Sequence, residues 1–146
     1  MYSMLTHAHS GLRWLVLLFL VLAIANAAMK MNKPQATFGA TDKRLSLFAL
    51  IFTHIQLIIG LILYFISPKV QFSAETMGNT VLRFYTVEHI SLMLIAIVLI
   101  TMGYSKAKRK EGGKKFKTTF WYYLIGLVLI LVSIPWPFRN LGAGWF

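Results

Sequence analysis

The chain of 146 residues contains no cysteine and only four acidic residues. The absence of cysteine excludes disulfides, thiolate metal sites, iron–sulfur clusters and covalent c-type haem attachment. Charged residues make up 13% of the chain and apolar residues 58%, whereas soluble domains average about 25% and about 45–50%. Patterns typical of hydrolases, nucleotide-binding proteins and metalloproteases are also missing. This composition excludes an ordinary soluble enzyme and indicates a membrane protein.

Four continuous apolar runs take up most of the chain. Each approaches or exceeds the roughly 20 residues that a helix needs to cross a bilayer, and transmembrane β-strands would instead alternate apolar and polar residues. We therefore predict an all-α protein, a single integral membrane domain over residues 1–146 that forms a four-helix transmembrane bundle with up-down-up-down topology. The predicted helices are Leu12–Met29, Leu45–Ile66, Phe84–Tyr104 and Phe120–Ile134, the last continuing to Trp136.

The sequence Ala25-Asn26-Ala27 resembles a signal-peptide cleavage site. No lysine or arginine precedes Arg13, however, so the charged leading region of a signal peptide is missing. We expect the first run to be kept as a transmembrane helix.

The net charge of +11 is distributed unevenly. Most basic residues lie in two loops, residues 30–44 and 106–117, and the remaining four are Arg13, Lys69, Arg83 and Arg139. Because short loops rich in lysine and arginine stay cytoplasmic, we predict a multi-pass protein of the bacterial inner membrane with both termini on the periplasmic or extracellular side. The charge is then topological and implies no nucleic-acid partner. We interpret Lys106–Lys117 as an ordinary cytoplasmic loop in preference to a patch for anionic lipid or a protein partner.

Each predicted helix carries small residues on one face. Helices in lipid pack through such residues, because apolar side chains gain little by leaving the lipid. A step of seven residues nearly completes two helical turns, so each set indicates the face turned towards the bundle interior. The sets are Ala23 and Ala27; Ser46, Thr53 and Gly60; Ala96 and Gly103; and Thr119, Gly126 and Ser133.

Ionisable side chains at membrane depth are costly and mark functional candidates. All four histidines lie in or beside the apolar runs, and none lies in a basic loop. His89 shares the face of Ala96 and Gly103, and His54 lies beside the inward Thr53. Two imidazoles on facing helices can ligate the iron of a b-type haem without covalent attachment. We predict His54 and His89 as these ligands, with His9 paired with His89 as the alternative.

Arg13 shares a helix face with His9. Its planar guanidinium suits the haem carboxylates, so we predict Arg13 as a cofactor-binding residue. Other interpretations stay open. Arg13 and Glu88 are predicted to form a structural ion pair if no cofactor is bound, and His89 would then only hydrogen-bond a neighbouring helix. A proton or ion carrier using Glu88 and His89 is less well supported, because the chain shows no inverted repeat.

Four stretches of the chain carry a resemblance to a known group. They are His9–Trp14, Thr53–Gln56 with Gly60, Arg83–His89 and Pro135–Arg139. In these stretches the chain resembles short four-span bacterial membrane proteins described as cytochrome b-like. The resemblance implies haem b binding and electron transfer, with His54, His89 and His9 as the candidate ligands.

These observations lead to two hypotheses of function. The first is a membrane-embedded b-type haem protein of electron transfer, linked to quinone or a respiratory complex and without independent catalytic activity. The alternative is a non-catalytic accessory or scaffold subunit of a larger membrane complex, or a homo-oligomer, with no cofactor. The apolar tail Asn140–Phe146 fits the alternative. Both place the chain among membrane lipids.

Overall fold

The computed structural model describes all 146 residues, and it is entirely helical. The elements are α1 (Tyr2–Lys30), α2 (Ala40–Ile66), α3 (Thr80–Arg83), the π-helical turn η1 (Phe84–Glu88), α4 (His89–Ala107), α5 (Gly112–Ser133) and the 3-10 turn η2 (Pro137–Arg139). α3, η1 and α4 run on as one helix over Thr80–Ala107. Four helices are long and apolar enough to cross a membrane. The predicted all-α, four-helix membrane bundle is confirmed.

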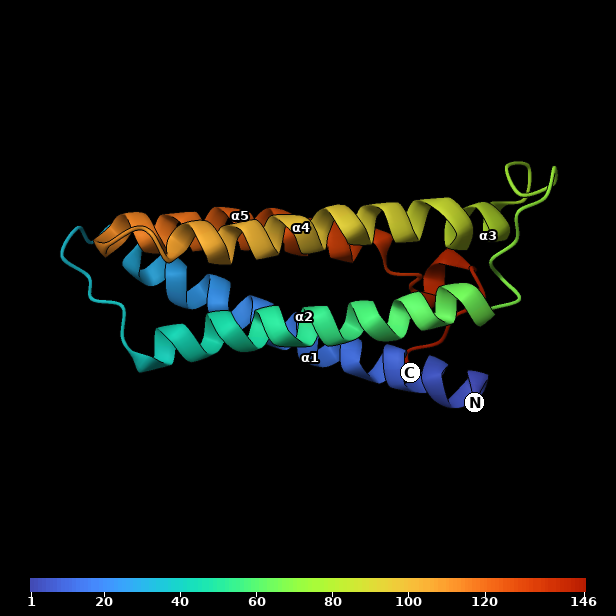
Figure 1. Ribbon diagram of the computed structural model, residues 1–146, viewed down its shortest axis with the longest axis horizontal. Helices are drawn as coiled ribbons and strands as arrows, with labels where there is room; N and C mark the ends of the chain where they lie inside the picture. The colour runs from blue at the N-terminus through green and yellow to red at the C-terminus, as the bar shows by residue number, and fades with distance from the viewer.

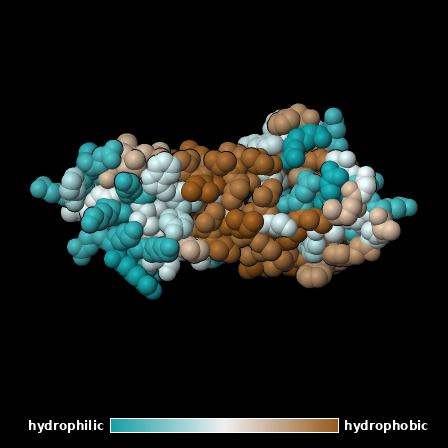
Figure 2. Space-filling model, turned by 90° about the horizontal axis from the view of Figure 1, so that it is seen from above, coloured by the Kyte–Doolittle hydropathy of each residue, from teal (hydrophilic) through white to brown (hydrophobic).

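Successive long helices run in opposite directions, so both chain termini lie at one end of the bundle (Figure 1). We call this the terminal end; it also carries the loop of residues 67–79. The opposite end, here the basic end, carries the loops of residues 31–39 and 108–111. Figure 2 shows a hydrophobic band between two more hydrophilic ends on the face in view. This banding is that of a protein whose middle lies in lipid.

All four membrane helices begin before the residue that the sequence pattern predicts, and the difference is largest for α1 and α5. α1 begins at Tyr2 and not at Leu12, and α5 begins at Gly112 and not at Phe120. Polar residues lower the hydropathy of these first turns, but they do not interrupt the backbone hydrogen bonds of a helix. As a consequence, His9 and Arg13 both lie on the continuous helix α1.

The predicted small-residue faces do form the interior. Ala96 and Ser133 are fully buried and Ala23 is 2% exposed. At Gly103 an added Cβ would overlap the Cβ of Tyr122. Glycine at this position therefore permits the close approach of α4 and α5.

The four long helices do not pack evenly around the bundle. α1 packs along both α2 and α5, and α4 packs along α5, whereas α2 and α4 have few contacts with each other. The bundle is therefore least closed between α2 and α4.

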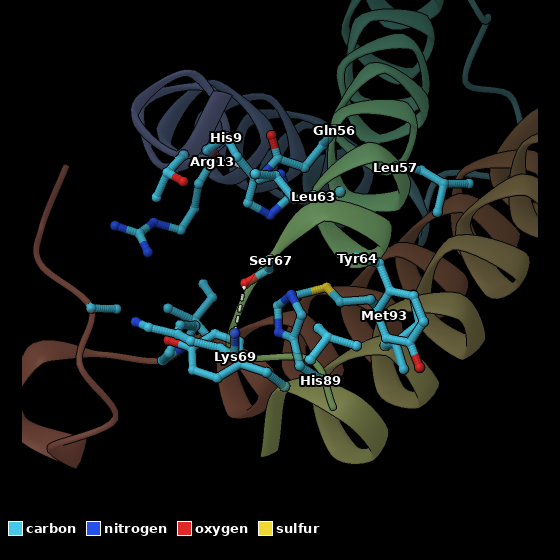
Figure 3. Close-up of a pocket in the computed structure, with 18 of the residues that line it drawn as sticks. His9, Arg13, Gln56, Leu57, Leu63, Tyr64, Ser67, Lys69, His89 and Met93 are labelled. Atoms are coloured by element: carbon cyan, nitrogen blue, oxygen red, sulfur yellow. Dashed lines mark hydrogen bonds between the residues drawn. The ribbon is translucent and has the colours of Figure 1, made fainter. Parts of the chain in front are cut away.

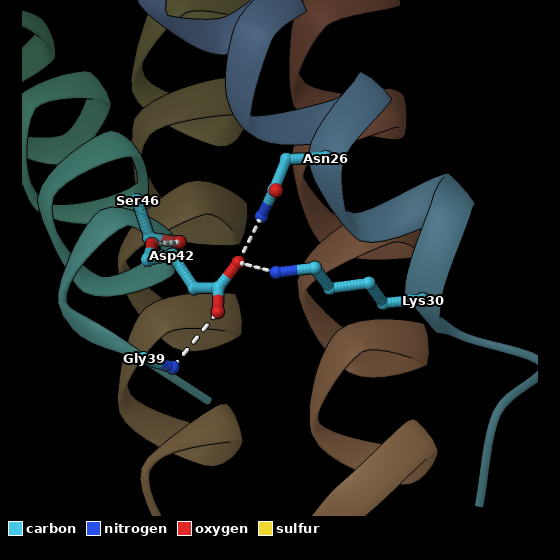
Figure 4. A network of polar contacts seen from close by, with 5 residues as sticks. All are labelled: Asn26, Lys30, Gly39, Asp42 and Ser46. Carbon is cyan, nitrogen blue, oxygen red and sulfur yellow. Dashed lines mark hydrogen bonds and ion pairs between the residues drawn. The ribbon is translucent and has the colours of Figure 1, made fainter. Parts of the chain in front are cut away.

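A buried carboxylate joins α1 to α2 at the basic end (Figure 4). Asp42 is 2% exposed. Its Oδ1 accepts hydrogen bonds from Lys30 at 2.5 Å and Asn26 at 2.7 Å, and its Oδ2 accepts one from the Gly39 backbone N–H at 2.8 Å. Oδ1 therefore joins α1 to α2, and Oδ2 caps the start of α2.

Candidate functional site

A cavity lies at the terminal end, where α2 and α4 separate. Its walls come from α1, α2, α4, the end of α5 and tail residues 142–144. The space between these side chains, with its open mouth, is about 1350 Å³. Most of this space is open to the surroundings, and the enclosed part is about 230 Å³. A large ligand would therefore occupy the mouth of the cavity as well as its enclosed part.

The π-helical turn η1 precedes the cavity residue His89. The backbone N–H of His89 bonds to the carbonyl of Phe84, five residues earlier. Such turns shift the helix register by one residue and are frequent at functional sites. The Tyr64 hydroxyl donates to the Thr86 carbonyl at 2.8 Å and ties the turn to α2. With this register, Tyr85 and His89 both line the cavity.

His89 has one ring nitrogen engaged and one free. Its Nδ1 lies 2.7 Å from the Ser133 carbonyl oxygen on α5. A carbonyl can only accept, so Nδ1 carries the proton and donates it. In the neutral ring Nε2 then holds a lone pair, and no hydrogen bond engages it. A histidine held through Nδ1 with a free Nε2 has the form of a metal ligand.

His9 on α1 faces His89 across the cavity (Figure 3). The two ring centroids are 6.4 Å apart and the ring planes make an angle of 73°. The Nδ1 of His9 is buried without a hydrogen-bond partner. Its Cε1 would lie 3.0 Å from a Cβ added at Gly60 on α2. Gly60 therefore provides the space in which the His9 ring sits.

The separation of these rings suits a metal between them. Two imidazoles that held one metal in a straight line would have ring centroids about 6.2 Å apart, with about 2.0 Å for each metal–nitrogen bond and about 1.1 Å from each nitrogen to its centroid; the observed separation is 6.4 Å. A bare ion would need a third or fourth protein ligand, and no group of three His, Cys, Asp or Glu side chains is suitably placed. Haem iron needs only two axial ligands.

Arg13 brings a buried positive charge to the cavity. It is 7% exposed, and its Nη2 donates to the Trp145 carbonyl at 2.7 Å. Its guanidinium carbon lies 5.4 Å and 5.7 Å from the ring centroids of Trp14 and Trp136. Its Nε is buried without a partner. Buried charges are normally paired, so this donor calls for an anionic group.

Lys69 adds a second positive charge to the cavity wall. Its Nζ donates to the Gly142 carbonyl and lies 4.9 Å from the Tyr85 ring centroid. No Asp or Glu is among the residues that line the cavity. The two cations are compensated only by backbone carbonyls and aromatic rings, which is the electrostatic setting for a ligand carrying carboxylates.

The predicted ion pair between Arg13 and Glu88 does not form. Glu88 accepts instead from Nε of Arg83 at 2.7 Å. Arg83 precedes Glu88 by five residues, one π-helical turn, which brings the two side chains together on the surface of their own helix. Arg13 therefore has no acidic partner.

The favoured ligand pair His54 and His89 is also not brought together. The Nε2 of His54 donates to the Thr101 hydroxyl at 2.9 Å, because that hydroxyl gives its own proton to the Ile97 carbonyl. His54 therefore ties α2 to α4 and does not line the cavity. The reason is its helix position: Thr53 faces the interior, and the next residue is turned about 100° away. The alternative pair, His9 with His89, is the one that faces the cavity.

Several cavity residues were not predicted as site residues. Gln56 donates through Nε2 to the His9 carbonyl at 2.8 Å, and its Oε1 is buried without a partner. Tyr85 lies four residues before His89, a spacing that points to a shared helix face. No local signal identifies Lys69 or tail residues 142–144, since they reach the cavity from loops.

Comparison of the chain with known protein families, curated proteins and solved structures found no match.

Proposed function

We propose that this chain is a membrane-embedded b-type haem protein of electron transfer, in which His9 and His89 would hold the haem iron. The observation that carries the proposal is the pair of imidazoles facing each other at 6.4 Å, one of them held through Nδ1 by Ser133. The resemblance of the sequence to cytochrome b-like membrane proteins points the same way. His54 serves as the control histidine, because it lies outside the pair and its Nε2 already donates to Thr101.

The residues around the cavity fit a haem group. Arg13 and Lys69 are suited to its carboxylates, and apolar side chains such as Met93 and Ile97 to the faces and edges of the macrocycle. Bound there, the group supplies one-electron chemistry between ferric and ferrous iron. The chain itself holds the two imidazole rings at a set distance and sets the local charge through Arg13.

The charge distribution supports an orientation. The basic end carries most lysines and arginines, so it belongs on the cytoplasmic side of a bacterial inner membrane. The cavity would then lie in the half of the membrane nearer the periplasm or exterior. We propose a lipid-soluble quinone or a respiratory complex as the electron partner, because the cavity lies within the membrane-spanning part of the bundle.

The test is the reduced-minus-oxidised absorption spectrum of protein purified from haem-replete cells. We expect the bands of a low-spin b-type haem, and we expect His9→Ala and His89→Ala each to abolish them. His54→Ala should keep them. A colourless wild-type protein from such cells, or loss of the bands only in His54→Ala, would contradict the proposal.

A second candidate function is that of an accessory subunit without cofactor. The observation that favours it is the aromatic tail at the terminal end, where Phe138 and Phe146 are 71% and 74% exposed. These rings lie 6.1 Å from Trp136 and 6.2 Å from Trp14. Co-purification of a stable membrane partner with a pigment-free chain supports this function, whereas a pigmented chain that purifies alone opposes it.

A further inference from the structure

A second cavity lies at the basic end, far from His9 and His89. It opens between the start of α2, the end of α4 and the start of α5, and it comprises about 590 Å³ with its mouth. Its lining residues are Phe38, Lys43, Ser46, Tyr104, Ala107, Lys108, Lys115 and Thr119. Lys108 and Lys115 belong to the basic stretch of residues 106–117, and Lys43 comes from the start of α2. The fold therefore brings two separate basic segments to one cavity.

These lysines have no acidic partner. The two ion pairs of the protein join Lys30 to Asp42 and Arg83 to Glu88. Asp42 and Glu111 both lie at this end of the bundle. Both oxygens of Asp42 are already engaged by other donors, and Glu111, at the start of α5, forms no ion pair. Three like charges around one cavity repel one another, and an anion between them relieves that repulsion.

Aromatic rings hold two of the ammonium groups in place. The Nζ of Lys115 lies 4.2 Å from the Phe38 ring centroid, and the Nζ of Lys108 lies 4.7 Å from that of Tyr104. Cation–π contact positions an ammonium without using its N–H donors. These donors stay free for the oxygens of a bound group.

We infer that this cavity binds the phosphate group of an anionic phospholipid. It lies at the end of membrane-spanning helices, the level of lipid headgroups. Nearer the middle of the bundle the same helices expose apolar side chains, among them Met102 and Trp121 at 39% and 48%. A phospholipid can place its phosphate among the lysines and its chains along these side chains. A zwitterionic headgroup carries its own ammonium, which the lysines repel.

The test compares two triple variants of the full chain in detergent. Lys43→Gln, Lys108→Gln and Lys115→Gln together remove the cavity charges. Lys110→Gln, Lys114→Gln and Lys117→Gln remove the same charge from the basic loop and the start of α5, but none of these three residues lines the cavity. Native mass spectrometry counts retained lipid, and thermal unfolding is followed during titration with phosphatidylglycerol, phosphatidylcholine or inorganic phosphate.

We expect the wild-type chain to retain phosphatidylglycerol and to gain thermal stability from it, with little effect of phosphatidylcholine or inorganic phosphate. The cavity variant should bind phosphatidylglycerol at least about tenfold more weakly, since each basic side chain near anionic lipid contributes a factor of about five. The control variant should bind nearly as the wild type does.

Three results would overturn the inference: equal weakening in both variants, equal binding of phosphatidylcholine, or equal stabilisation by inorganic phosphate. Should the triple cavity variant fail to fold, the single variants Lys43→Gln and Lys108→Gln serve the same comparison against Lys110→Gln. The haem spectrum is read separately, so failure of this site is distinguishable from failure of the proposed function.

Discussion

The His89 ring is bound to α5 through its Nδ1, which donates to the Ser133 carbonyl at 2.7 Å. Ser133 is fully buried, and its own hydroxyl donates to the Leu129 carbonyl at 2.8 Å. The ring is therefore fixed by a backbone group that no side-chain change removes. This contact sets the tautomer and aims Nε2 at the cavity, and it makes the predictions below specific to His89 and its partner His9.

The angle between the two imidazole planes predicts a spectroscopic property. The planes are 73° apart, and axial rings close to perpendicular leave two iron d-orbitals nearly equal in energy. We expect the ferric protein to give a highly anisotropic low-spin electron paramagnetic resonance signal. A rhombic spectrum of the kind given by parallel imidazole planes would contradict this ligand geometry.

Gly60→Ala tests the space around His9. The added Cβ would lie 3.0 Å from Cε1 of His9, so the ring must shift and its alignment with His89 suffers. We expect haem affinity to fall roughly 5- to 100-fold, as the cost of overpacking implies, measured by haem titration of the apoprotein.

The matched control is Gly11→Ala on α1, where an added Cβ meets nothing within 4 Å. It should leave haem affinity unchanged and raise thermal stability slightly, because glycine in a helix costs about 0.5–1 kcal/mol relative to alanine. Equal haem affinity in the two variants would show that Gly60 does not serve His9.

Arg13→Gln removes the buried positive charge beside the ligand pair. Oxidised haem carries one more positive charge than reduced haem, so a nearby cation favours the reduced form. We expect the midpoint potential to fall by tens of millivolts, on the order of 1 kcal/mol, in a spectroelectrochemical titration. Arg44→Gln is the control, because Arg44 is exposed, lies at the basic end of α2 and does not line the cavity; a shift as large in this variant would count against a specific role for Arg13.

Asp42→Asn tests the buried network at the basic end. The change removes the charge that Lys30 and Asn26 contact at 2.5 Å and 2.7 Å. We expect a loss of about 1–3 kcal/mol in the free energy of unfolding, as for other unsatisfied buried polar groups, measured by denaturation in mixed detergent.

Glu88→Gln is the same chemical change at a partly exposed ion pair. The side chains of Arg83 and Glu88 are 36% and 41% exposed, and surface pairs contribute about 0–1 kcal/mol. A stability loss in Glu88→Gln as large as that in Asp42→Asn would show that burial is not what makes the Asp42 network matter.

The parts predictable from sequence are those that depend on local composition. Continuous apolar runs require helices in lipid because the backbone must satisfy its own hydrogen bonds, and small residues at seven-residue spacing mark the packed faces, as Ala96 and Ser133 confirm. The start of α1 was predicted too late, since hydropathy measures solvent preference and the helix continues through polar residues to Tyr2.

The choice between His9 and His54 was beyond the sequence. Both lie on membrane helices next to inward-facing positions, and only the packing of α1 against Gly60 and of His54 against Thr101 separates them. The π-helical turn η1 was also beyond the sequence. It brings Arg83 and Glu88 together, so Glu88 does not pair with Arg13. No local pattern marked that turn.

The sequence by itself determined the number of helices, their alternating directions and which end of the bundle carries most of the basic residues. These follow from hydropathy and from the distribution of lysine and arginine. The tertiary structure alone decided which histidines face each other, why Arg13 lacks an acidic partner, and how lysines from two separate segments come to line one cavity. Such relationships depend on helix rotation and register. Because successive residues on a helix point about 100° apart, one histidine can face a cavity while another only hydrogen-bonds a neighbouring helix.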